Sequence, residues 1–322
     1  MELEETETVA PGIILVLMGF ASSQIINNNR IESIEVTPKI EIVDVPSEFS
    51  VFRQVGCNRY ISVFGVHIFA TPTTPKKKLS HAAGVLAQYL DNDEDGVPDN
   101  TSVLSQLVSR NVFIIMPGTD AEMEGLEMEL VEEAGYRFGQ DLYGEETKPD
   151  FLVDGKINAL DGGYYDGALE EILHPITHYG YANAYPEVFG TRRGTTLAKC
   201  MDAARGGCFE RVPQGGPKSG YPAEAWYHYT DETCDYGCMI TEYIYWALTS
   251  ILGTQDFPGR QENLEVEWEL NTREWVRTGD AAVYELLTDP QYRFPTKAPD
   301  GNYKPSAFPV TVVPIVDVND ED

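Results

Sequence analysis

Alternation of apolar and polar residues predicts strands in the first third of the chain. Between residues 34 and 42, isoleucine and valine alternate with polar residues, which is the period of a half-buried strand. The segment 60–71 (YISVFGVHIFAT) is rich in β-branched and aromatic residues and predicts a second strand. Residues 112–116 form a short apolar run before Pro117 and Gly118, so we expect a buried strand there.

Helical spacing is typical of much of the remaining chain. Between residues 79 and 90, apolar residues recur every three or four positions, after a Thr74-Pro75 pair that favours a helix start. A second short helix is expected to begin at Thr101 or Ser102. Further helices are predicted over 122–134, 167–182, 235–252 and 280–287, with Gly253 ending the third of these. The segment 186–232 is rich in glycine, proline and aromatic residues, and we expect it to be mostly loop.

Strands and helices in this irregular order predict an α+β fold, in a single domain over residues 31–309. Residues 310–322 are expected to be an acidic tail, and residues 1–30 a leader or a flexible N-terminus. The apolar run 12–22 has the length of a signal-peptide core and is shorter than the ~20 residues that span a bilayer. The residues before it are acidic, without Lys or Arg, so a buried strand or an unusual N-terminus is the alternative to a cleaved leader.

The amino-acid composition limits the kinds of molecule that this protein is expected to bind. The chain has 322 residues with 42% apolar residues, enough for a sizeable core. It carries 52 Asp and Glu against 23 Lys and Arg, a net charge of -29. Such a charge repels nucleic acids and anionic membrane surfaces and attracts divalent cations and basic or matrix partners. We therefore expect no nucleic-acid partner and no membrane span.

The cysteines leave more than one pairing open. Cys57 stands alone, whereas the other four fall in two close pairs, Cys200 with Cys208 and Cys234 with Cys238. In a secreted chain these favour two disulfides and one free thiol. A Cys234–Cys238 bridge inside a regular helix would be strained, so pairing between the two clusters is an alternative. Ligation of a metal by four cysteines is less favoured, because neither spacing is C-x₂-C.

Alternate aspartates around a glycine predict a Ca²⁺ site. Asp91, Asp93 and Asp95 occupy every second position, Gly96 follows, and Asp99 comes three residues later. Ca²⁺ takes 6–8 oxygen ligands, and carboxylates so spaced converge only where a glycine permits a tight turn. The side chain of Asp99 and the main-chain carbonyl of Val97 would complete the ligand set.

This segment, with a helix expected on each side, resembles the EF-hand loop in a helix–Ca²⁺ loop–helix element. Position 12 of that loop is Ser102 here and not the usual bidentate glutamate. The sequence is therefore closer to the DxDxDG loops of extracellular calcium modules such as thrombospondin type 3 repeats. The resemblance implies a structural Ca²⁺ site of an affinity that suits calcium levels outside the cytosol, and hence a secreted protein.

A second candidate metal site lies in residues 168–181 (ALEEILHPITHYGY). His174 and His178 are four residues apart, so on a helix they share a face and can bind one Zn²⁺. The segment resembles the HExxH helix of zincin metalloproteases, although Pro175 stands where the catalytic glutamate belongs and would kink the helix. The resemblance implies a zincin-like fold. Glu171, three residues before His174, is the candidate base, with a role as a metal ligand as the alternative.

A zinc site needs a third protein ligand, and Glu242 is the favoured candidate. It lies in an apolar helix, where an unpaired carboxylate is costly to bury. Asp235, His228 and Asp231 are alternatives.

Two functions follow from these sites. The first is an extracellular calcium-binding protein with a zincin-like second metal site and, if that site is catalytic, metal-dependent hydrolysis. The second is a non-enzymatic, acidic calcium-binding protein of matrix, surface or mineral. A ligand-binding role for the aromatic cluster around Trp226 is a third hypothesis, although core packing is the favoured explanation of this cluster.

Overall fold

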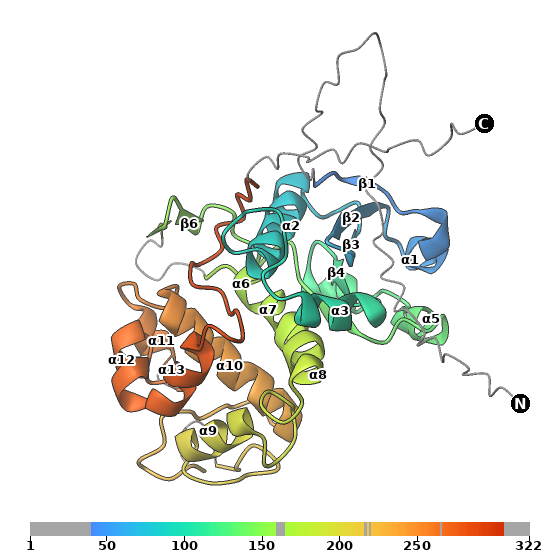
Figure 1. Ribbon diagram of the computed structural model, residues 1–322. Helices are drawn as coiled ribbons and strands as arrows, with labels where there is room; N and C mark the ends of the chain where they lie inside the picture. Colours follow the sequence, from blue (N-terminus) through green and yellow to red (C-terminus); the bar gives the residue numbers. More distant parts are fainter. Residues whose placement is uncertain (1–39, 159–164, 216–217, 219, 265, 306–322) are drawn as a thin grey trace, which may run out of the picture. The chain divides into compact units, whose positions relative to one another are not determined.

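A mixed five-stranded sheet organises the N-terminal half of the protein (Figure 1). The computed structural model describes residues 40–158, 165–215, 218, 220–264 and 266–305, which belong to one compact unit. The strands follow their order in the sequence: β1 (Val43–Asp44), β2 (Arg59–Val63), β3 (Val66–Ala70), β4 (Phe113–Met116) and β5 (Gly139–Asp141). The first three pair antiparallel, whereas β4 pairs parallel with both β3 and β5.

The segment predicted as one strand over 60–71 is a hairpin, so that prediction was wrong. Phe64 and Gly65 both have positive φ, at 50° and 87°, and they form the two-residue turn between β2 and β3. Turns of this kind match the twist of paired strands and require glycine-like conformations. The strand at residues 112–116 is confirmed as β4, whereas most of the strand predicted at 34–42 lies outside the described residues.

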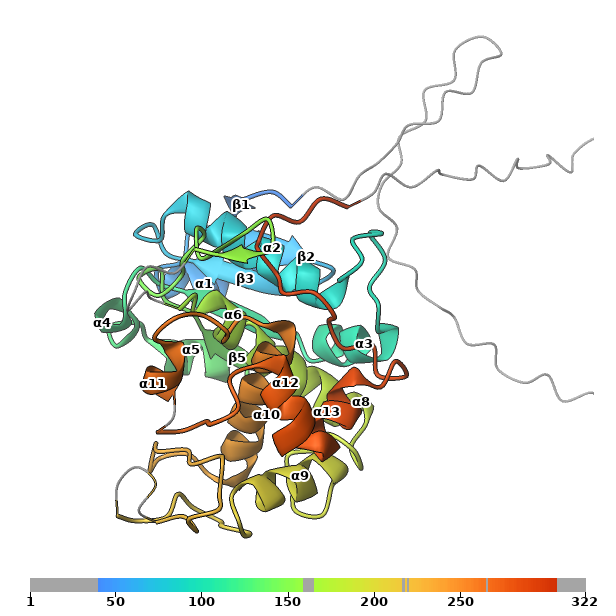
Figure 2. The ribbon, with the colours of Figure 1, turned by 90° about the vertical axis from the view of Figure 1, so that its left-hand side faces the viewer.

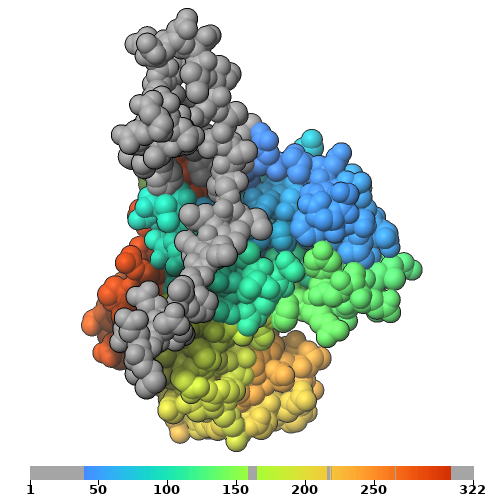
Figure 3. Space-filling view, turned by 45° about the vertical axis from the view of Figure 1, so that its right-hand side comes forward, coloured from blue at the N-terminus to red at the C-terminus, as the bar shows by residue number. Residues whose placement is uncertain are grey.

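The two faces of the sheet contact different cores. Tyr60, Phe69 and Phe113 point to the side covered by α1 (Ser50–Gln54) and α5 (Met128–Glu133). Their neighbours along the strands point to the other side, where α2 (Lys76–Leu90) and the C-terminal helices pack: Ile61, Ile68 and Ile114. This is the period of two that the strands require. Figure 2 shows α2 lying along the sheet, and Figure 3 shows the blue N-terminal residues beside the green residues of α4 and α5.

Helices make up most of the remaining regular secondary structure. They are η1 (Ser47–Phe49), α3 (Thr101–Ser109), α4 (Asp120–Met123), α6 (Ala168–Glu171), α7 (Leu173–Pro175), η2 (Ile176–Tyr181), α8 (Ala182–Ala184), α9 (Thr196–Ala204), α10 (Tyr236–Leu252), α11 (Arg260–Leu264), α12 (Arg273–Gly279) and α13 (Ala281–Thr288). A small hairpin pairs β6 (Leu152–Val153) with β7 (Lys156–Ile157). Among the described residues, no helix combines the length and the apolar character needed to cross a membrane.

Several predicted helix boundaries are confirmed and others are corrected. Gly253 ends α10 in the left-handed conformation, and Asp280 caps α13. The helix predicted at 122–134 is instead two short helices, α4 and α5. The predicted loop 186–232 contains α9, whose start is capped by Thr195. The mixed α and β structure in one unit agrees with the predicted fold class.

The C-terminal segment 296–304 packs along α2. The side chain of Gln88 accepts hydrogen bonds from the N–H groups of Asp300 and Gly301, at 3.0 and 2.8 Å. A Cβ atom at Gly84 would lie 2.0 Å from the Gly301 carbonyl oxygen. Glycine is therefore needed at this position of α2, because any side chain would displace the segment.

This contact predicts the effect of Gly84→Ala. Alanine favours a helix over glycine by about 1 kcal/mol, but overpacking against backbone costs about 1–3 kcal/mol. We expect the second effect to prevail and the free energy of unfolding to fall, as measured by urea denaturation. Ser80→Ala, at an exposed position of the same helix, is the control and should not destabilise. A more stable Gly84→Ala protein would contradict the packing.

One disulfide is present among the described residues, between Cys234 and Cys238, with Cα atoms 5.4 Å apart. Cys57, Cys200 and Cys208 are free, so the predicted second disulfide and the pairing between clusters are wrong. The bridge does not lie inside a regular helix, because α10 begins at Tyr236 and Cys234 lies before it. The disulfide thereby ties the residues before α10 to its first turn.

Candidate metal sites

The predicted histidine helix is a continuous helical run from Ala168 to Ala184 with a change of winding inside it. α6 and α7 carry the first part, and from Ile176 to Tyr181 the run is a π-helix, η2. Pro175 has no N–H to donate to the carbonyl of residue 171, which favours a local rearrangement of the helical hydrogen bonds. π-Helical turns are frequent at functional sites. Here the wider turn separates His174 from His178.

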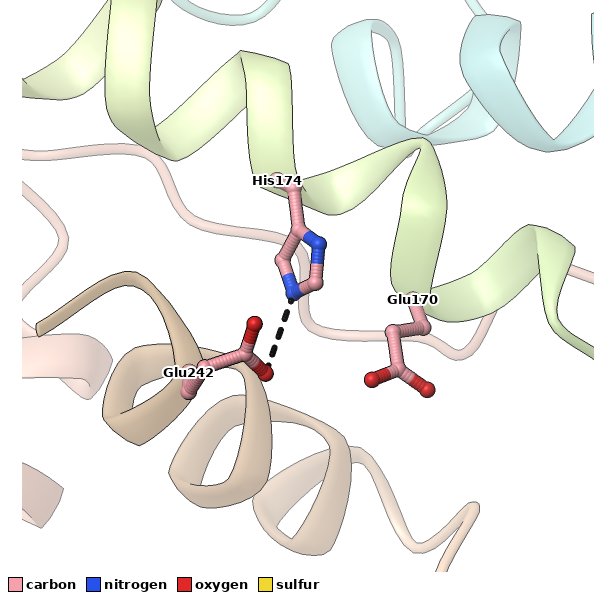
Figure 4. A group of neighbouring side chains, drawn as sticks. All are labelled: Glu170, His174 and Glu242. Carbon is pink, nitrogen blue, oxygen red and sulfur yellow. Dashed lines mark ion pairs between the residues drawn. The ribbon is translucent and has the colours of Figure 1, made fainter. Parts of the chain in front are cut away.

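Three side chains from two helices meet at His174 (Figure 4). Glu170 and His174 are one helical turn apart on the first helical run, and Glu242 comes from α10. Each offers a ligand atom, and these atoms lie within 4.8 Å of one another. The His174 Nε2 atom is 3.5 Å from Oε2 of Glu242. One imidazole and two carboxylates therefore converge on a common point.

The Nε2 atom of His174 is buried and makes no hydrogen bond of good geometry; the Oε2 atom of Glu242, at 3.5 Å, is an ion-pair partner when the imidazole is protonated. The side chain as a whole is 9% exposed, and that of Glu242 is 12% exposed. The 3.5 Å between Nε2 and Glu242 is longer than a good hydrogen bond, so this nitrogen is only weakly satisfied. Its position in front of two carboxylates is the arrangement expected when a cation is the missing partner.

The opposite nitrogen of His174 faces Glu171. The distance from Nδ1 to Oε2 of Glu171 is 3.4 Å, and the same carboxylate oxygen accepts a hydrogen bond from Nε2 of Gln140 at 2.6 Å. Gln140 lies in β5, so the edge of the sheet holds Glu171 in place. Glu171, predicted as a base, thus lies on the side of the imidazole away from Glu242.

The predicted ligand His178 lies outside this group. Its Nδ1 atom is 2.9 Å from the hydroxyl oxygen of Thr241, so it links η2 to α10. Burial lowers its pKa, and the nearby His174 adds to this effect. The structure therefore brings Glu170 to the point where the sequence pattern expected His178.

The pKa values of Glu170 and His174 are both raised in this group. Burial raises the pKa of Glu170 to about 8; His174 opposes this, while Glu171 and Glu242 add to it. Burial by itself lowers the pKa of His174, but the carboxylates of Glu242 and Glu171 raise it well above its ordinary value. Both pKa shifts favour the protonated form, so added positive charge stabilises this buried group.

The three alternative ligands serve other roles. Asp235 caps α10 by accepting from the N–H of Cys238 at 2.9 Å. Asp231 accepts hydrogen bonds from the N–H and hydroxyl of Thr233, both at 2.8 Å. His228 lines a separate cavity. Of the candidates for the third ligand, Glu242 is the one that the structure brings to His174.

The aspartate loop connects α2 to α3, as the sequence pattern predicted. α2 ends at Leu90, and α3 begins at Thr101 with Asn100 as its cap, instead of Thr101 or Ser102. Ligand oxygens of Asp91, Asp93 and Asp95 lie within 4.8 Å of one another, with Asp91 buried and the other two exposed.

Hydrogen bonds within the loop fix its turn. Gly96 has a φ of 85°, and its N–H donates to Asp91 Oδ2 at 2.7 Å. The N–H of Asp95 donates to the other oxygen of Asp91 at 3.1 Å. From outside, the hydroxyl of Tyr303 donates to Asp91. The buried Asp91 thus anchors both the loop and the C-terminal segment.

The two other predicted calcium ligands, Asp99 and Val97, also form hydrogen bonds within the loop. Oδ2 of Asp99 accepts from the N–H of Asn92 at 2.6 Å, which closes the loop, and Asp99 is not part of the three-aspartate group. Burial raises its pKa, and Asp93 and Asp95 add to this rise, so it lies within their electrostatic reach. The N–H of Val97 donates to Asp95 at 2.8 Å.

Comparisons with known proteins give no match. No protein-family model matches the chain, and neither does any curated protein or solved structure. The function is therefore inferred from the sites themselves.

Sequence reasoning missed Glu170, although a signal for it was present. Glu170 precedes His174 by four residues, the same spacing that drew attention to His178. The two histidines were favoured because imidazole is the commoner zinc ligand. The wider winding after Pro175 removes His178 from the group and leaves the upstream carboxylate.

Proposed function

We propose that the protein is a metal-dependent hydrolase that binds Zn²⁺ through Glu170, His174 and Glu242. One observation carries the proposal: the buried Nε2 atom of His174 makes no hydrogen bond of good geometry, lies 3.5 Å from Glu242, and faces two carboxylates from two helices. Two carboxylates balance the charge of one divalent cation, and the cation would take the place of the protons that the group otherwise binds.

The donor set favours Zn²⁺ over a hard alkaline-earth ion. Imidazole suits first-row transition metals, whereas Ca²⁺ and Mg²⁺ are bound by oxygen alone. Three protein ligands are also the number used in catalytic zinc sites, which leave a position open for water. A bound Zn²⁺ would supply a Lewis acid and lower the pKa of a coordinated water.

The likeness to zincins improves when the motif is moved by four residues. In the register Glu170-Glu171-x-x-His174, a glutamate replaces the first histidine ligand and Glu171 follows it directly. Pro175 then lies after the motif and no longer replaces the glutamate. Glu242 on the later helix α10 corresponds to the third carboxylate of a gluzincin-type site. We extend the proposal to a zincin-like arrangement of these two helices.

In this register the carboxylate of Glu171 faces Nδ1 of the His174 imidazole. A carboxylate at the second nitrogen of a ligating histidine fixes the tautomer, so that Nε2 presents its lone pair to the metal. Gln140 in turn restrains Glu171 from β5. The geometry supports a positioning role for Glu171 and a ligand role for Glu170, His174 and Glu242.

Glu171→Gln distinguishes positioning from base catalysis. Loss of an outer carboxylate partner typically lowers metal affinity 10–100-fold, and we expect a Zn²⁺ affinity reduced by roughly that factor. The measurement is competition of the protein with a zinc-sensitive dye. Unchanged zinc affinity together with lost turnover would instead make Glu171 the base.

We also propose that the loop 91–99 binds one Ca²⁺ ion as a structural site. The convergence of Asp91, Asp93 and Asp95 at the glycine turn supports it. Ser102 at position 12 supplies no bidentate carboxylate, so the affinity suits the extracellular space. The Cys234–Cys238 disulfide is consistent with an oxidising compartment.

Hydrolysis is tested with the full-length protein loaded with Zn²⁺ and Ca²⁺ and a mixture of peptides. Cleavage that a zinc chelator stops, and that added Zn²⁺ restores, is the expected result. Protein that binds calcium but no zinc would contradict the hydrolase and favour the second function, a non-enzymatic acidic protein of matrix, surface or mineral.

A further inference from the structure

The C-terminal segment 296–304 contains neither helix nor strand, and it lies beside α2 (Figure 2). Its main-chain groups therefore need partners in other parts of the protein. Gln88 of α2 supplies one of them, because its side chain accepts from the N–H groups of Asp300 and Gly301. The amide nitrogen of Gln88 also donates to the Asp300 carboxylate at 3.0 Å. α2 thus holds the middle of the segment.

Asn92, the second residue of the aspartate loop, holds the start of the segment. Its Oδ1 atom accepts from the N–H groups of Thr296 and Lys297, at 2.9 and 3.0 Å. Its Nδ2 atom donates to the carbonyl of Lys297 at 2.9 Å. One side chain therefore bonds to both main-chain groups of Lys297, which a primary amide can do because it carries a donor and an acceptor.

Glu94, the fourth residue of the aspartate loop, holds the end of the segment. Its Oε2 atom accepts from the N–H of Lys304 at 2.9 Å, and its Oε1 atom accepts from the side chain of Gln88 at 2.8 Å. Beside it, the hydroxyl of Tyr303 donates to Asp91. Loop residues thus fix both ends of the C-terminal segment, with Gln88 between them.

The aspartate loop presents two sets of side chains to two different partners. Asp91, Asp93 and Asp95 bring carboxylate oxygens within 4.8 Å of one another, at the proposed calcium position. The residues between them, Asn92 and Glu94, bind the C-terminal segment. Both sets depend on the same conformation of five consecutive residues.

Calcium is expected to stabilise that conformation of the loop. Three carboxylates at such short distances repel one another, and a divalent cation between them offsets the repulsion. An ion that binds only the ordered loop favours every contact that the ordered loop makes. Because coupling between two binding events is reciprocal, docking of the C-terminal segment must also raise the affinity of the loop for Ca²⁺.

We propose that Ca²⁺ in the aspartate loop holds the C-terminal segment 296–304 against α2, and that loss of Ca²⁺ releases it. The inference rests on the proposed calcium site and adds a regulatory role to it. Release makes the main chain around Lys297 accessible to proteases. The segment is therefore protected where calcium is abundant and cleaved where calcium falls.

Trypsin measures the release at a single peptide bond. The side chain of Lys297 is exposed, but its main chain is bonded to Asn92, so cleavage after Lys297 requires the segment to leave the loop. Full-length protein is digested with Ca²⁺ or with a calcium chelator, and the products are followed by mass spectrometry. We expect cleavage after Lys297 to be about tenfold slower with Ca²⁺.

Cleavage after Arg193, in the exposed segment before α9, is the internal control of this digestion. We expect its rate to be the same with Ca²⁺ and with the chelator. Equal acceleration at both bonds on removal of calcium would indicate loosening of the whole protein and would overturn the proposal.

Gly301→Ala tests the reciprocal effect from the side of the segment. Gly301 has a φ of 74°, and a Cβ atom there would lie 2.0 Å from Nδ1 of His81 on α2, so alanine displaces the segment and leaves the loop residues unchanged. We expect the Ca²⁺ affinity, measured by calorimetry, to fall about tenfold. Unchanged affinity would contradict the coupling.

Gly155→Ala is the matched control for this variant. Gly155 has a φ of 72°, and a Cβ atom there would meet nothing within 4 Å. Alanine therefore has the same backbone cost at this position without the clash. We expect the Ca²⁺ affinity of Gly155→Ala protein to equal that of the wild type, and an equal loss in both variants would count against the proposal.

Calcium binding by the wild-type protein separates this inference from the calcium site on which it rests. If the protein binds Ca²⁺ but cleavage after Lys297 proceeds at the same rate with and without it, the site stands and the coupling is wrong. If the wild-type protein binds no Ca²⁺, both proposals are wrong.

Discussion

His174→Ala is expected to abolish zinc binding and, with it, hydrolysis. The substitution removes the single imidazole of the group and leaves Glu170 and Glu242 as two carboxylates without a nitrogen donor. Because loss of an outer partner alone costs 10–100-fold in metal affinity, loss of a direct ligand should cost more than about 100-fold. Equilibrium dialysis against Zn²⁺, followed by elemental analysis, measures this directly.

His178→Ala is the matched control for that experiment. It removes the same side chain four residues later in the same helical run, where the imidazole contacts Thr241 and not the carboxylates. We expect zinc binding to remain, with a loss of about 1 kcal/mol in the free energy of unfolding from the missing hydrogen bond. If His178→Ala loses zinc and His174→Ala keeps it, the ligand assignment is wrong.

Calcium is expected to raise the unfolding free energy of the wild-type protein strongly. An ion that binds only the folded state adds about 2.7 kcal/mol when its concentration is 100 times the dissociation constant. Asp93→Asn should remove most of this gain, because it replaces a charged ligand with a neutral group of the same shape. Denaturation curves with Ca²⁺ and with a calcium chelator provide the measurement.

Asp93 is the informative position because its side chain is exposed, whereas Asp91 is buried and also bonds to Gly96 and Tyr303. Substitution of Asp91 would damage the loop even without calcium. Asp154→Asn, in the exposed turn between β6 and β7, is the control. An equal response of wild-type and Asp93→Asn protein to Ca²⁺ would rule out the loop as the binding site.

Local sequence patterns predicted the long helices and strands better than the turns and short helices between them. The periodic segments behind α2, α10 and β4 were recognised because burial on one side of an element imposes its period on the sequence. The hairpin at Phe64-Gly65 was missed because a continuous apolar run hides a turn made by only two residues. α9 was missed because glycine and proline on either side concealed its short amphipathic pattern.

The metal site shows a similar limit. Glu242 was singled out from sequence because a carboxylate in an apolar helix needs a partner. Glu170 was not, since its role depends on a packing contact with α10 and on the wider winding after Pro175. Neither the packing contact nor the change of winding can be predicted from the spacing of residues along the chain. The exchange of His178 for Glu170 is thus a tertiary effect that i,i+4 reasoning alone does not resolve.

Anomalous X-ray diffraction at the zinc absorption edge, from crystals grown with Zn²⁺, tests the central claim most directly. The account predicts one strong anomalous peak between Nε2 of His174 and the carboxylates of Glu170 and Glu242. A map without a peak at that point, or with zinc bound at His178 in its place, would contradict it.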